Sequence, residues 1–495
     1  MQEKCGVVGI ASQKLSNSFE LALLAARGVQ HRGLQGAGMA LNSKKGLKVY
    51  RGTGTIDEVF TNDVVPDFDI PNNWIMVHCR YGTYGDYDQT NLQPCIASSP
   101  AGEKVAVIHN GQFAGLSDLK SRVEKLNKKT YSDDTSDTYL FTQLLVGSKG
   151  KSWDEKIVNC VDKCSGAFSL LIGVGKNLYA VRDKFGIRPL FIGKLSGSYM
   201  VASETHAFNK VDGRVEREVG RGEVIKLNSQ GMQSLTKKSK NSHFCDFEFA
   251  YFSRPDSLYA SSEDSNVKDW SSYGSFRERC GEKLAVEKPI INADFVVGVP
   301  SSGVSLATGY AAKLGLPYRQ AIIRDHFDPF GAQRLFMRDD VMNKISSRVL
   351  GKLSISPDLK VWKDKIVVIG DDSIVRGNVS KKVTETIFKL GAREVHWIIG
   401  FPPLMNPCHL GVSIRSDGEL AAPKYGGDPA KIAKKIGATS VNYISNLGFV
   451  EAKYPGVKVT IPKNKDEIFV ANGGCGGCIT GLYPVDKNGK YYKNR

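Results

Sequence analysis

The sequence predicts two domains of different class: an α+β domain of stacked antiparallel sheets covered by helices, followed by an α/β domain built on a parallel sheet. The 495 residues exceed what one hydrophobic core usually holds. The first half consists of short alternating or apolar runs separated by Gly, Asn and Asp, which are typical of antiparallel strands. The second half instead repeats an apolar strand, a glycine-containing turn and a helix.

In the first half, antiparallel strands are expected at residues 74–85, 104–113 and 166–175. Helices are expected at residues 19–30 and 137–146. The polar, lysine-rich stretch at 228–245 contains little to bury, so we place the domain boundary there. The predicted domains are residues 5–240 and 241–495.

In the second half, two strand–turn–helix units are expected. Residues 293–303 lead into one helix, and residues 365–378 lead into a helix that starts at Val379. A third strand at residues 394–403 follows that helix after a short turn, which completes a βαβ unit. Such units form parallel sheets with helices on both faces.

The composition excludes several classes of protein. Hydrophobic residues make up 41% of the chain and charged residues 24%, which is near the globular average and excludes a disordered chain. No apolar run approaches the roughly 20 residues of a membrane-spanning helix. Residues 1–15 lack the basic start and long apolar stretch of a secretory signal, so we expect a cytoplasmic protein.

The formal net charge of +16 suits a polyanionic ligand, either nucleic acid or a small phosphorylated substrate. The basic residues are dispersed, which is typical of a solvated surface. A basic nucleic-acid-binding or scaffold protein without catalysis is one alternative function. No basic-aromatic reader motif accompanies the charge, so nucleic acid is not an expected partner. The ten cysteines are too sparse for a disulfide scaffold, which leaves catalysis or metal binding to consider.

Cys5 opens a strand-like run at residues 5–10 and has two interpretations. It can be a small apolar side chain in a buried strand. Alternatively, the chain is cut before Cys5, and the freed α-amine is the general base for the thiol. An α-amine titrates near pH 7.7–8.0, roughly, so it can accept the thiol proton at physiological pH.

Six strings in the first half favour the second interpretation because they occur in one order. They are HRGLQGAG (31–38), HCRYGTYG (78–85), IHNGQF (108–113), SDT (136–138), VRDKFGIRPL (181–190) and ASE (202–204). In these strings the chain resembles the N-terminal-nucleophile glutamine amidotransferases. The predicted fold of the first half is therefore the N-terminal-nucleophile sandwich, in which stacked antiparallel sheets lie between helices.

The resemblance implies a role for each matching residue. Asn110 and the Gly111 backbone N–H would stabilise the oxyanion that forms when the thiolate attacks an amide carbonyl. Arg80 would bind the carboxylate of free glutamine and Asp137 its ammonium group, with Thr83 helping to hold the substrate. The alternative for Arg80 and Asp137 is an ordinary surface ion pair.

Two strand-to-helix turns in the second half point to a phosphorylated sugar. Asp371 and Asp372 start the string DDSIVRGN (371–378), where they can simply cap a helix. They can also bind both ribose hydroxyls, while backbone N–H groups of the turn bind a 5′-phosphate. The turn VPSSG (299–303) would then receive pyrophosphate and magnesium. These turns resemble the type I phosphoribosyltransferases, whose ligands lie at the carboxyl ends of a parallel sheet.

The resemblance implies a phosphoribosylpyrophosphate site with bound Mg²⁺. Magnesium is expected near Ser302 and the carboxylates of Asp371 and Asp372. The residues that match the phosphoribosylpyrophosphate site are Ser302, Gly303, Arg334, Asp371, Asp372, Ser373, Arg376, Gly377 and Asn378.

Both halves together resemble the glutamine phosphoribosylpyrophosphate amidotransferases, from Cys5 to about Pro484. The resemblance implies that glutamine is hydrolysed at Cys5 and that ammonia passes through an internal channel to the second site. There it would displace pyrophosphate from C1 of the sugar, giving 5-phosphoribosylamine in the first step of de novo purine synthesis. The activity is that of a pentosyltransferase. The resemblance also implies a homotetramer and inhibition by purine nucleotides.

Cys475 and Cys478 form a CxxC pair, which alone fits either a metal site or a glycine-rich turn. Part of the same family carries a 4Fe-4S cluster on four thiolates, and Cys245, Cys408, Cys475 and Cys478 match its positions. Bound zinc and free thiols are the alternatives. Cluster-bearing members also tend to have a short propeptide, so we expect residues 1–4 to be removed, which leaves Cys5 at the N-terminus.

The second half departs from the family pattern at several positions. Asn378 and Val379 stand where the family has two threonines, and Ser301 stands where an acid is usual. The loop at 324–337 aligns only around Arg334. Loss of a charge-assisted hydrogen bond costs about 1.5–3 kcal/mol, so we expect weaker substrate binding. An alternative function is a divergent amidotransferase that delivers ammonia to a different phosphosugar or nucleotide.

Overall fold

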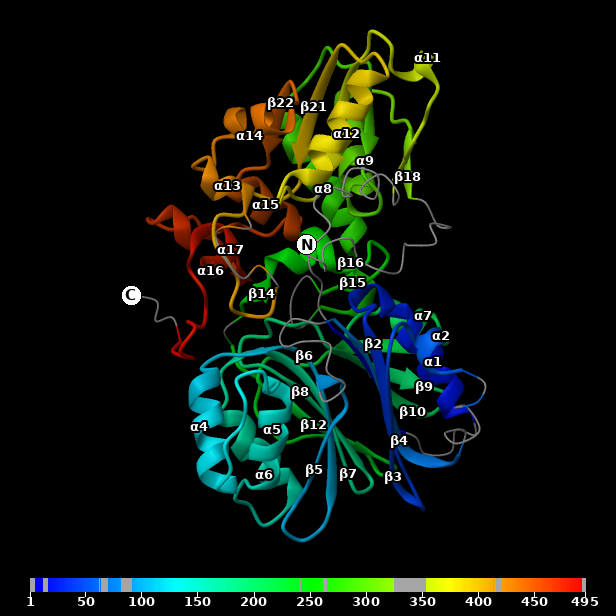
Figure 1. The fold of residues 1–495 in the computed structure, drawn as a ribbon, viewed down its shortest axis with the longest axis vertical. Helices are drawn as coiled ribbons and strands as arrows, with labels where there is room; N and C mark the ends of the chain where they lie inside the picture. Colours follow the sequence, from blue (N-terminus) through cyan, green and yellow to red (C-terminus); the bar gives the residue numbers. More distant parts are fainter. Residues whose placement is uncertain are drawn as a thin grey trace.

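A computed structural model places the two halves end to end along the long axis of the molecule (Figure 1). The structure describes residues 5–11, 17–61, 63, 70–81, 91–240, 242–260, 265–324, 353–412, 414, 418 and 420–491. All ten cysteines lie within these ranges and are free thiols. Thr83 and Arg334, two of the predicted site residues, lie outside them.

The first half contains two antiparallel sheets stacked between helices (Figure 1). One sheet has the order β11-β9-β10-β1-β4-β2-β3 and the other the order β13-β12-β8-β7-β6-β5. The strands of the first sheet are β1 (Gly6–Ala11), β2 (Gly36–Ser43), β3 (Gly46–Thr53), β4 (Asn72–Arg80), β9 (Phe191–Leu195), β10 (Ser198–Ala202) and β11 (Arg214–Glu218). Those of the second are β5 (Cys95–Ser98), β6 (Lys104–Phe113), β7 (Gly166–Val174), β8 (Asn177–Arg182), β12 (Val224–Asn228) and β13 (Gly231–Ser234).

Alternate side chains of these strands form separate hydrophobic layers. On β1, Val7 packs between the two sheets, whereas Val8 packs toward the helices that cover the first sheet. The helices over the first sheet are α1 (Ser18–Gly28), α2 (Ile56–Val59) and α7 (His206–Asn209). Those over the second sheet are α4 (Leu116–Asn127), α5 (Asp137–Val146) and α6 (Trp153–Asp162).

The predicted elements of the first half are confirmed, but further helices are present. The three predicted strands lie in β4, β6 and β7, and α5 has the predicted bounds. It begins after Ser136, whose Oγ accepts a hydrogen bond from the Tyr139 N–H at 3.2 Å. The sequence interpretation missed α4, of which only Leu119 and Val123 are buried. Such a narrow apolar stripe gives a weak helical signal.

The second half is built on a four-stranded parallel sheet with the order β17-β20-β21-β22. The strands are β17 (Phe295–Gly298), β20 (Ile366–Asp371), β21 (Glu394–Ile399) and β22 (Ser440–Tyr443). One face packs on α8 (Tyr273–Glu287), α9 (Ser302–Leu314) and α15 (Asn446–Lys453). The other face packs on α11 (Leu359–Trp362), α12 (Asn378–Lys389) and α14 (Pro429–Ile436). The predicted βαβ unit corresponds to β20, α12 and β21, whereas β22 was not predicted.

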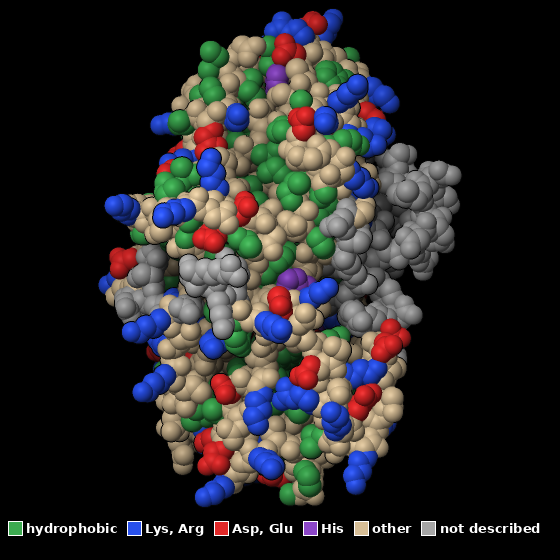
Figure 2. All heavy atoms as spheres, turned by 90° about the vertical axis from the view of Figure 1, so that its left-hand side faces the viewer, with side chains coloured by type: hydrophobic (Ala, Val, Ile, Leu, Met, Phe, Trp, Pro, Cys, Tyr) green, Lys and Arg blue, Asp and Glu red, His purple; other side chains and the backbone are tan. Residues whose placement is uncertain are grey.

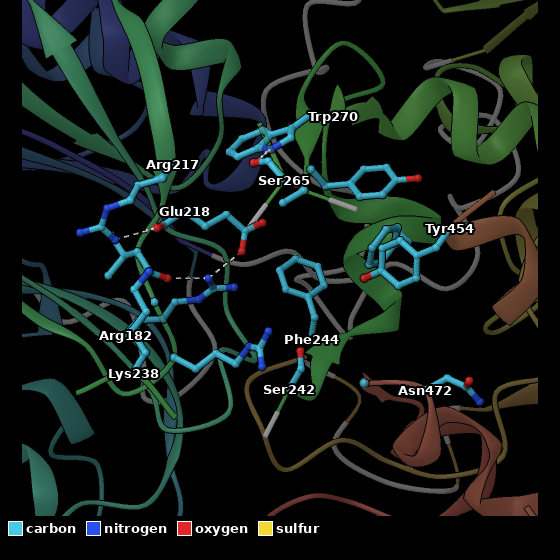
Figure 3. Close-up of a pocket in the computed structure, with 17 residues that line it drawn as sticks. Arg182, Arg217, Glu218, Lys238, Ser242, Phe244, Ser265, Trp270, Tyr454 and Asn472 are labelled. Carbon is cyan, nitrogen blue, oxygen red and sulfur yellow. Dashed lines mark hydrogen bonds and ion pairs between the residues drawn. The ribbon is translucent and has the colours of Figure 1, made fainter. Parts of the chain in front are cut away.

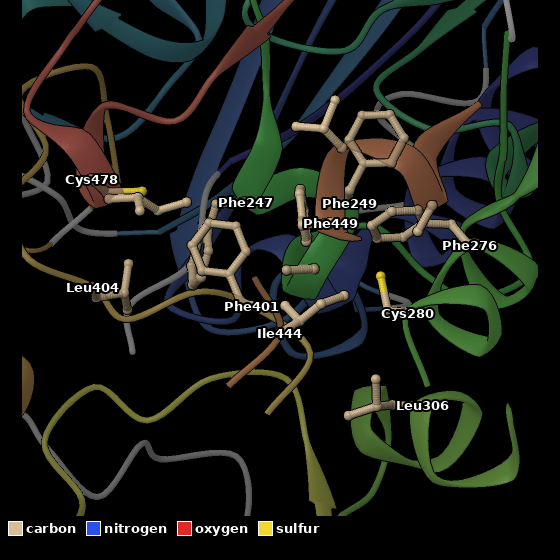
Figure 4. Packing of buried hydrophobic residues seen from close by; sticks show 14 of the residues in the cluster. Phe247, Phe249, Phe276, Cys280, Leu306, Phe401, Leu404, Ile444, Phe449 and Cys478 are labelled. Atoms are coloured by element: carbon tan, nitrogen blue, oxygen red, sulfur yellow. The ribbon is translucent and has the colours of Figure 1, made fainter. Parts of the chain in front are cut away.

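A cluster of aromatic side chains joins the start of the second half to its sheet (Figure 4). Phe249 makes edge contacts with Phe276 of α8, with ring centroids 5.1 Å apart. Phe247 contacts Phe401 in the same way at 5.1 Å. Both phenylalanines belong to the segment around a π-helix (Glu248–Phe252). Such pairs of buried rings fix the position of this segment.

The C-terminal segment returns to both halves. The short strand β14 (Phe244–Cys245) pairs in parallel with β23 (Gly474–Cys475). Further on, the Gly115 N–H at the start of α4 donates a hydrogen bond to the Lys487 carbonyl oxygen at 3.0 Å. Residues far apart in the sequence therefore close the junction between the halves.

On the face drawn in Figure 2, Lys and Arg side chains are spread over both halves and interleaved with Asp and Glu. This distribution agrees with the solvated surface that the sequence indicates. Within the described ranges, no helix is long and apolar enough to cross a membrane.

A buried ion pair provides a test of how the junction is stabilised. Lys453 Nζ lies 2.6 Å from Asp246 Oδ1, and the two side chains are 1% and 0% exposed. We expect Lys453→Met to lower the free energy of unfolding by about 3–5 kcal/mol, because it leaves a buried carboxylate without a partner. The double variant D246N/K453M removes both charges and should restore much of this loss. Denaturant unfolding measures both, and equal stability of K453M and wild type would contradict the expectation.

Candidate active site

Cys5 lies directly before β1, which is flanked by β4 and β10. The side chain is buried, and its thiol donates a hydrogen bond to the Tyr81 carbonyl oxygen with a sulfur–oxygen distance of 3.8 Å. Burial raises the pKa of the Cys5 thiol; Arg80 and Arg32 act in the opposite direction, whereas Asp137 reinforces the shift. These charged groups therefore lie near the sulfur, although they are far apart in the sequence.

Asn110 and Gly111 lie on β6, opposite Ser169 and Phe168 of β7. Asn110 is completely buried, yet neither its amide nitrogen nor its amide oxygen has a hydrogen-bond partner among the described residues. A buried amide without a partner costs free energy unless a ligand satisfies it. Gly111 has a φ of 140°, and a β-carbon there would overlap the Ala167 carbonyl oxygen, so only glycine fits.

Asp137 is held at the first turn of α5. Its Oδ2 accepts a hydrogen bond from the Phe113 N–H at 3.0 Å, and its Oδ1 lies 3.7 Å from His109 Nδ1. Burial alone would raise the pKa of Asp137, but His109 and these hydrogen bonds together hold it below its ordinary value. The carboxylate is therefore ionised at neutral pH.

The second candidate site lies where β17 and β20 end. Gly298 is opposite Gly370 in the parallel register, so the turns after the two strands are neighbours. Ser302, the first residue of α9, donates a hydrogen bond from its Oγ to Asp372 Oδ2. A β-carbon on Gly303 would overlap the Gly370 carbonyl oxygen, so this close approach requires glycine.

The two acids of this turn lie close together, Asp372 buried and Asp371 partly buried. Ser373 Oγ donates to Asp372 Oδ1 at 2.6 Å, and the Asp372 N–H donates to Asp371 Oδ1 at 2.9 Å. Burial raises the pKa of both carboxyl groups, and the charge of Asp372 raises that of Asp371 further. A bound cation would relieve this repulsion.

The remaining residues of the turn lead into α12. Arg376 and Gly377 precede the helix, and Gly377 is its N-cap residue with a φ of 78°. Asn378 is the first residue of the helix, where backbone N–H groups can bind an anion. Val379 packs against the hydrophobic cluster under the helix.

Tyr251 belongs to the π-helix and is partly buried against the hydrophobic cluster of the second half. Burial, followed by the charges of Asp372 and Asp371, raises the pKa of its phenol. The π-helical segment therefore lies near the acids of the second candidate site.

Comparisons with known proteins agree with this geometry. Residues 78–210 match the model of the glutamine amidotransferase domain. The chain is 32% identical to the amidophosphoribosyltransferase of Homo sapiens, over 98% of each protein. It is 36% identical to a chloroplastic amidophosphoribosyltransferase of Glycine max, over 98% of this chain and 79% of the relative. The chain belongs to the amidophosphoribosyltransferase family.

A solved structure extends the family likeness to the whole fold. It is the glutamine phosphoribosylpyrophosphate amidotransferase from B. subtilis complexed with ADP and GMP, which matches with a TM-score of 0.82 and 31% identity over 97% of each chain. The predicted family is confirmed. So is the predicted fold class: an N-terminal-nucleophile sandwich is followed by a type I phosphoribosyltransferase fold with a parallel sheet.

The four cysteines singled out in this family member converge from three segments. Cys245 and Cys475 are paired across β14 and β23. Burial raises the pKa of Cys478, and the charges of Cys408, Cys245 and Cys475 raise it further, so all four sulfurs lie near one another. Among the described residues, no three His, Cys, Asp or Glu side chains surround a position for a single metal ion.

A buried network contacts Cys5, and we assigned no role to its residues from the sequence. Arg32 Nε donates a hydrogen bond to the Cys5 carbonyl oxygen at 3.2 Å, and Arg32 also contacts Glu204 and Glu248. Arg32 lies in HRGLQGAG and Glu204 in ASE. The sequence signal for Arg32 and Glu204 is a charged residue inside an otherwise apolar or glycine-rich string.

A cavity of about 210 Å³ opens at the junction, away from both candidate sites (Figure 3). Arg182, Glu218, Trp270 and Tyr454 are among its lining residues, and Glu218 forms an ion pair with Arg182 at 2.8 Å. None of the predicted site residues lines this cavity.

The steric constraint at Gly111 gives a test of the first site. Gly111→Ala should force β6 away from β7 and reduce the rate of glutamine hydrolysis by about 10²–10³-fold, the usual effect of losing one oxyanion donor. Gly231→Ala is a matched control, because Gly231 has a φ of 139° but no atom within 4 Å of the added carbon. The test measures the steady-state rate of glutamine hydrolysis and the melting temperature of both variants. Equal activity of the two variants would show that the Gly111 backbone does not contribute.

Proposed function

We propose that this chain is an amidophosphoribosyltransferase that hydrolyses glutamine and transfers the ammonia to C1 of phosphoribosylpyrophosphate. The products are glutamate, pyrophosphate and 5-phosphoribosylamine, and the reaction is the first step of de novo purine synthesis. The observation that carries the proposal is the presence of both candidate sites in one chain that is similar to amidophosphoribosyltransferases over 98% of its length. As an enzyme it is a pentosyltransferase with glutamine amidotransferase activity.

In the glutaminase reaction, Cys5 is the nucleophile. Its α-amine accepts the thiol proton, and the thiolate attacks the side-chain amide carbon of glutamine. The Asn110 amide and the Gly111 N–H donate hydrogen bonds to the oxyanion, which explains why a buried amide is left without a partner within the described part of the chain. The amine then gives its proton to the departing ammonia, and water hydrolyses the remaining thioester.

Glutamine is held by groups of opposite charge. Arg80 binds its α-carboxylate, and Asp137, which is ionised at neutral pH, binds its ammonium group. Thr83 remains a proposed contact outside the described residues. Ionic recognition of both main-chain groups favours the free amino acid over glutamine within a peptide.

The α-amine requires a chain that starts at Cys5. In the unprocessed chain, the nitrogen of Cys5 is a peptide amide, which cannot accept the thiol proton at physiological pH. We therefore propose that residues 1–4, which lie outside the described residues, are removed as a propeptide. The intact mass of the active protein reports this cleavage directly.

The phosphoribosyl site lies at the ends of β17 and β20. Asp371 and Asp372 bind the ribose hydroxyls, and the turn that contains Ser373, Arg376 and Gly377 binds the 5′-phosphate with the start of α12 at Asn378. Ser302 and Gly303 receive the pyrophosphate, with Arg334 as a further proposed contact outside the described residues.

Mg²⁺ fits the same site, because two neighbouring carboxyl groups have raised pKa values and Asp372 accepts a hydrogen bond from the Ser302 hydroxyl. When bound by Ser302, Asp371 and Asp372, Mg²⁺ would neutralise the pyrophosphate as it leaves. Ammonia reaches C1 through an internal channel in this proposal.

A 4Fe-4S cluster bound by Cys245, Cys408, Cys475 and Cys478 fits the second cofactor site. Cys245, Cys475 and Cys478 are buried and Cys408 is partly buried. Four thiolates near one another are unfavourable unless a cationic group neutralises them, and the sulfurs raise each other's pKa values. When bound, the cluster would tie the C-terminal segment to the start of the second half. It has no proposed role in the chemistry.

Nucleotide binding, oligomeric state and cellular location remain proposals. The complex of the B. subtilis relative with ADP and GMP supports purine nucleotides as ligands of this chain. The homotetramer and the cytoplasmic location stay predictions.

The alternative is an amidotransferase that delivers ammonia to a different phosphosugar or nucleotide. Asn378 favours it, because an amide replaces a hydroxyl at the phosphate-binding end of α12. Val379 does not favour the alternative, since its side chain packs against the hydrophobic cluster, where loss of a hydroxyl costs little.

Pyrophosphate release, measured with each nitrogen source, distinguishes these two functions. We expect purified protein to release pyrophosphate from phosphoribosylpyrophosphate with glutamine or with ammonium chloride as nitrogen source. Cys5→Ala should abolish the glutamine-dependent reaction and retain the ammonia-dependent one, because only the nucleophile is removed. Asp371→Asn should lose both. Glutamine hydrolysis without pyrophosphate release would contradict the proposal and support the alternative.

The cofactor proposal has a separate test. Anaerobically purified protein should contain about four iron atoms and four acid-labile sulfides per chain. Cys478→Ser should lose them, whereas Cys160→Ser, a buried cysteine of α6, should not. Zinc without labile sulfide would contradict the cluster.

A further inference from the structure

We propose that Glu248, which belongs to the second half, is a positioning residue for the nucleophile of the first half. It holds Arg32 against the carbonyl oxygen of Cys5. The inference rests on the proposed glutaminase function of Cys5 and assigns part of that site to the other half of the chain.

The contacts form one continuous path. Arg32 Nη2 donates to Glu248 Oε1 at 2.9 Å, and Arg32 Nη1 donates to Glu248 Oε2 at 3.1 Å. The same guanidinium donates from Nε to the Cys5 carbonyl oxygen at 3.2 Å. The paired contact to Glu248 fixes the plane of the guanidinium, and therefore also the direction of its Nε–H.

The network is buried and contains charges of both signs; His31 Nε2 also lies 2.8 Å from Glu204 Oε1. The side chains of Arg32, Glu204 and Glu248 are at most 1% exposed. Arg188 adds a second positive charge, with Nη1 3.7 Å from Glu248 Oε1. Removal of one partner from such a group leaves an uncompensated buried charge, so the guanidinium is expected to move when Glu248 is neutralised.

The contact from Arg32 acts on the main chain of Cys5 itself. The strand pairing of β1 starts at Gly6, opposite Cys79, so Cys5 itself lies outside the ladder. Once the propeptide is removed, no preceding residue restrains it. The hydrogen bond from Arg32 then sets the distance between the Cys5 thiol and the oxyanion donors on β6.

The segment that carries Glu248 is itself held firmly. Glu248 begins a π-helix, a rare element that is often found at functional sites. Arg277 of α8 donates to the Phe249 carbonyl oxygen at 3.0 Å and to the Ser253 carbonyl oxygen at 2.6 Å. A rigid support of this kind is what a positioning residue requires.

The test measures steady-state glutamine hydrolysis by the mature full-length protein. Glu248→Gln keeps the shape of the side chain but removes its charge, and kcat should fall by about tenfold to a hundredfold. The KM for glutamine should change less than threefold or so, because E248Q leaves the charges of Arg80 and Asp137 in place. The ammonia-dependent reaction should be retained. Glu248→Asp, which keeps the charge on a shorter side chain, should recover part of kcat and provides a second variant if E248Q is poorly folded.

Two comparisons distinguish positioning from a general loss of structure. D246N/K453M removes another buried ion pair from the same segment and should leave kcat unchanged. In a double-mutant cycle, E248Q should have little further effect on kcat in an Arg32→Lys background, because Glu248 acts through Arg32.

Three results would overturn the inference: wild-type kcat in E248Q, an equal fall of kcat in D246N/K453M, or additive effects with R32K. Wild-type protein that does not hydrolyse glutamine would instead refute the proposed function, and the inference would fall with it.

Discussion

The pairing of β1 with strands on both sides is the constraint on which the first site depends. The register that sets Gly6 opposite Cys79 brings Cys5 to the end of β4, next to Arg80. On the other side, Val8 lies opposite Ala202, two residues before Glu204. Because the side-chain period of a strand is two, a slip by one residue would reverse every side chain of β1. One register therefore determines where the nucleophile and its neighbours meet.

The second site depends on a comparable close approach between two parallel strands. Gly298 and Gly370 are paired, and the turns that follow them touch through Gly303. Side chains at these positions would separate the turns, and the buried Asp372 would lose its hydrogen bond from the Ser302 hydroxyl. In both halves, close packing of the backbone determines where the residues of the candidate site lie.

Much of this arrangement could be predicted from the sequence, since ordered strings mark both sites and the helix that starts at Asp137. The helix α4 could not be predicted from the sequence, because few of its residues are buried. The sequence places Asn378 and Val379 where two hydroxyl side chains are expected, but it does not show that Val379 packs against a hydrophobic cluster under α12. The contact between Arg32 and Glu248 joins residues 216 positions apart, and no local pattern encodes such a pair.

The position of Glu248 beyond the predicted boundary has a consequence for modular engineering. If the first half were excised or fused to a foreign acceptor module, Arg32 would keep Glu204 but lose the carboxylate that arrives from outside. Chimeras of this architecture would therefore need to carry the π-helical segment along with the donor unit. A cut within the polar stretch at 228–245 would remove that segment. A cut directly after Phe252 would still remove Arg254 and Ser257, which donate hydrogen bonds to Glu204 Oε2.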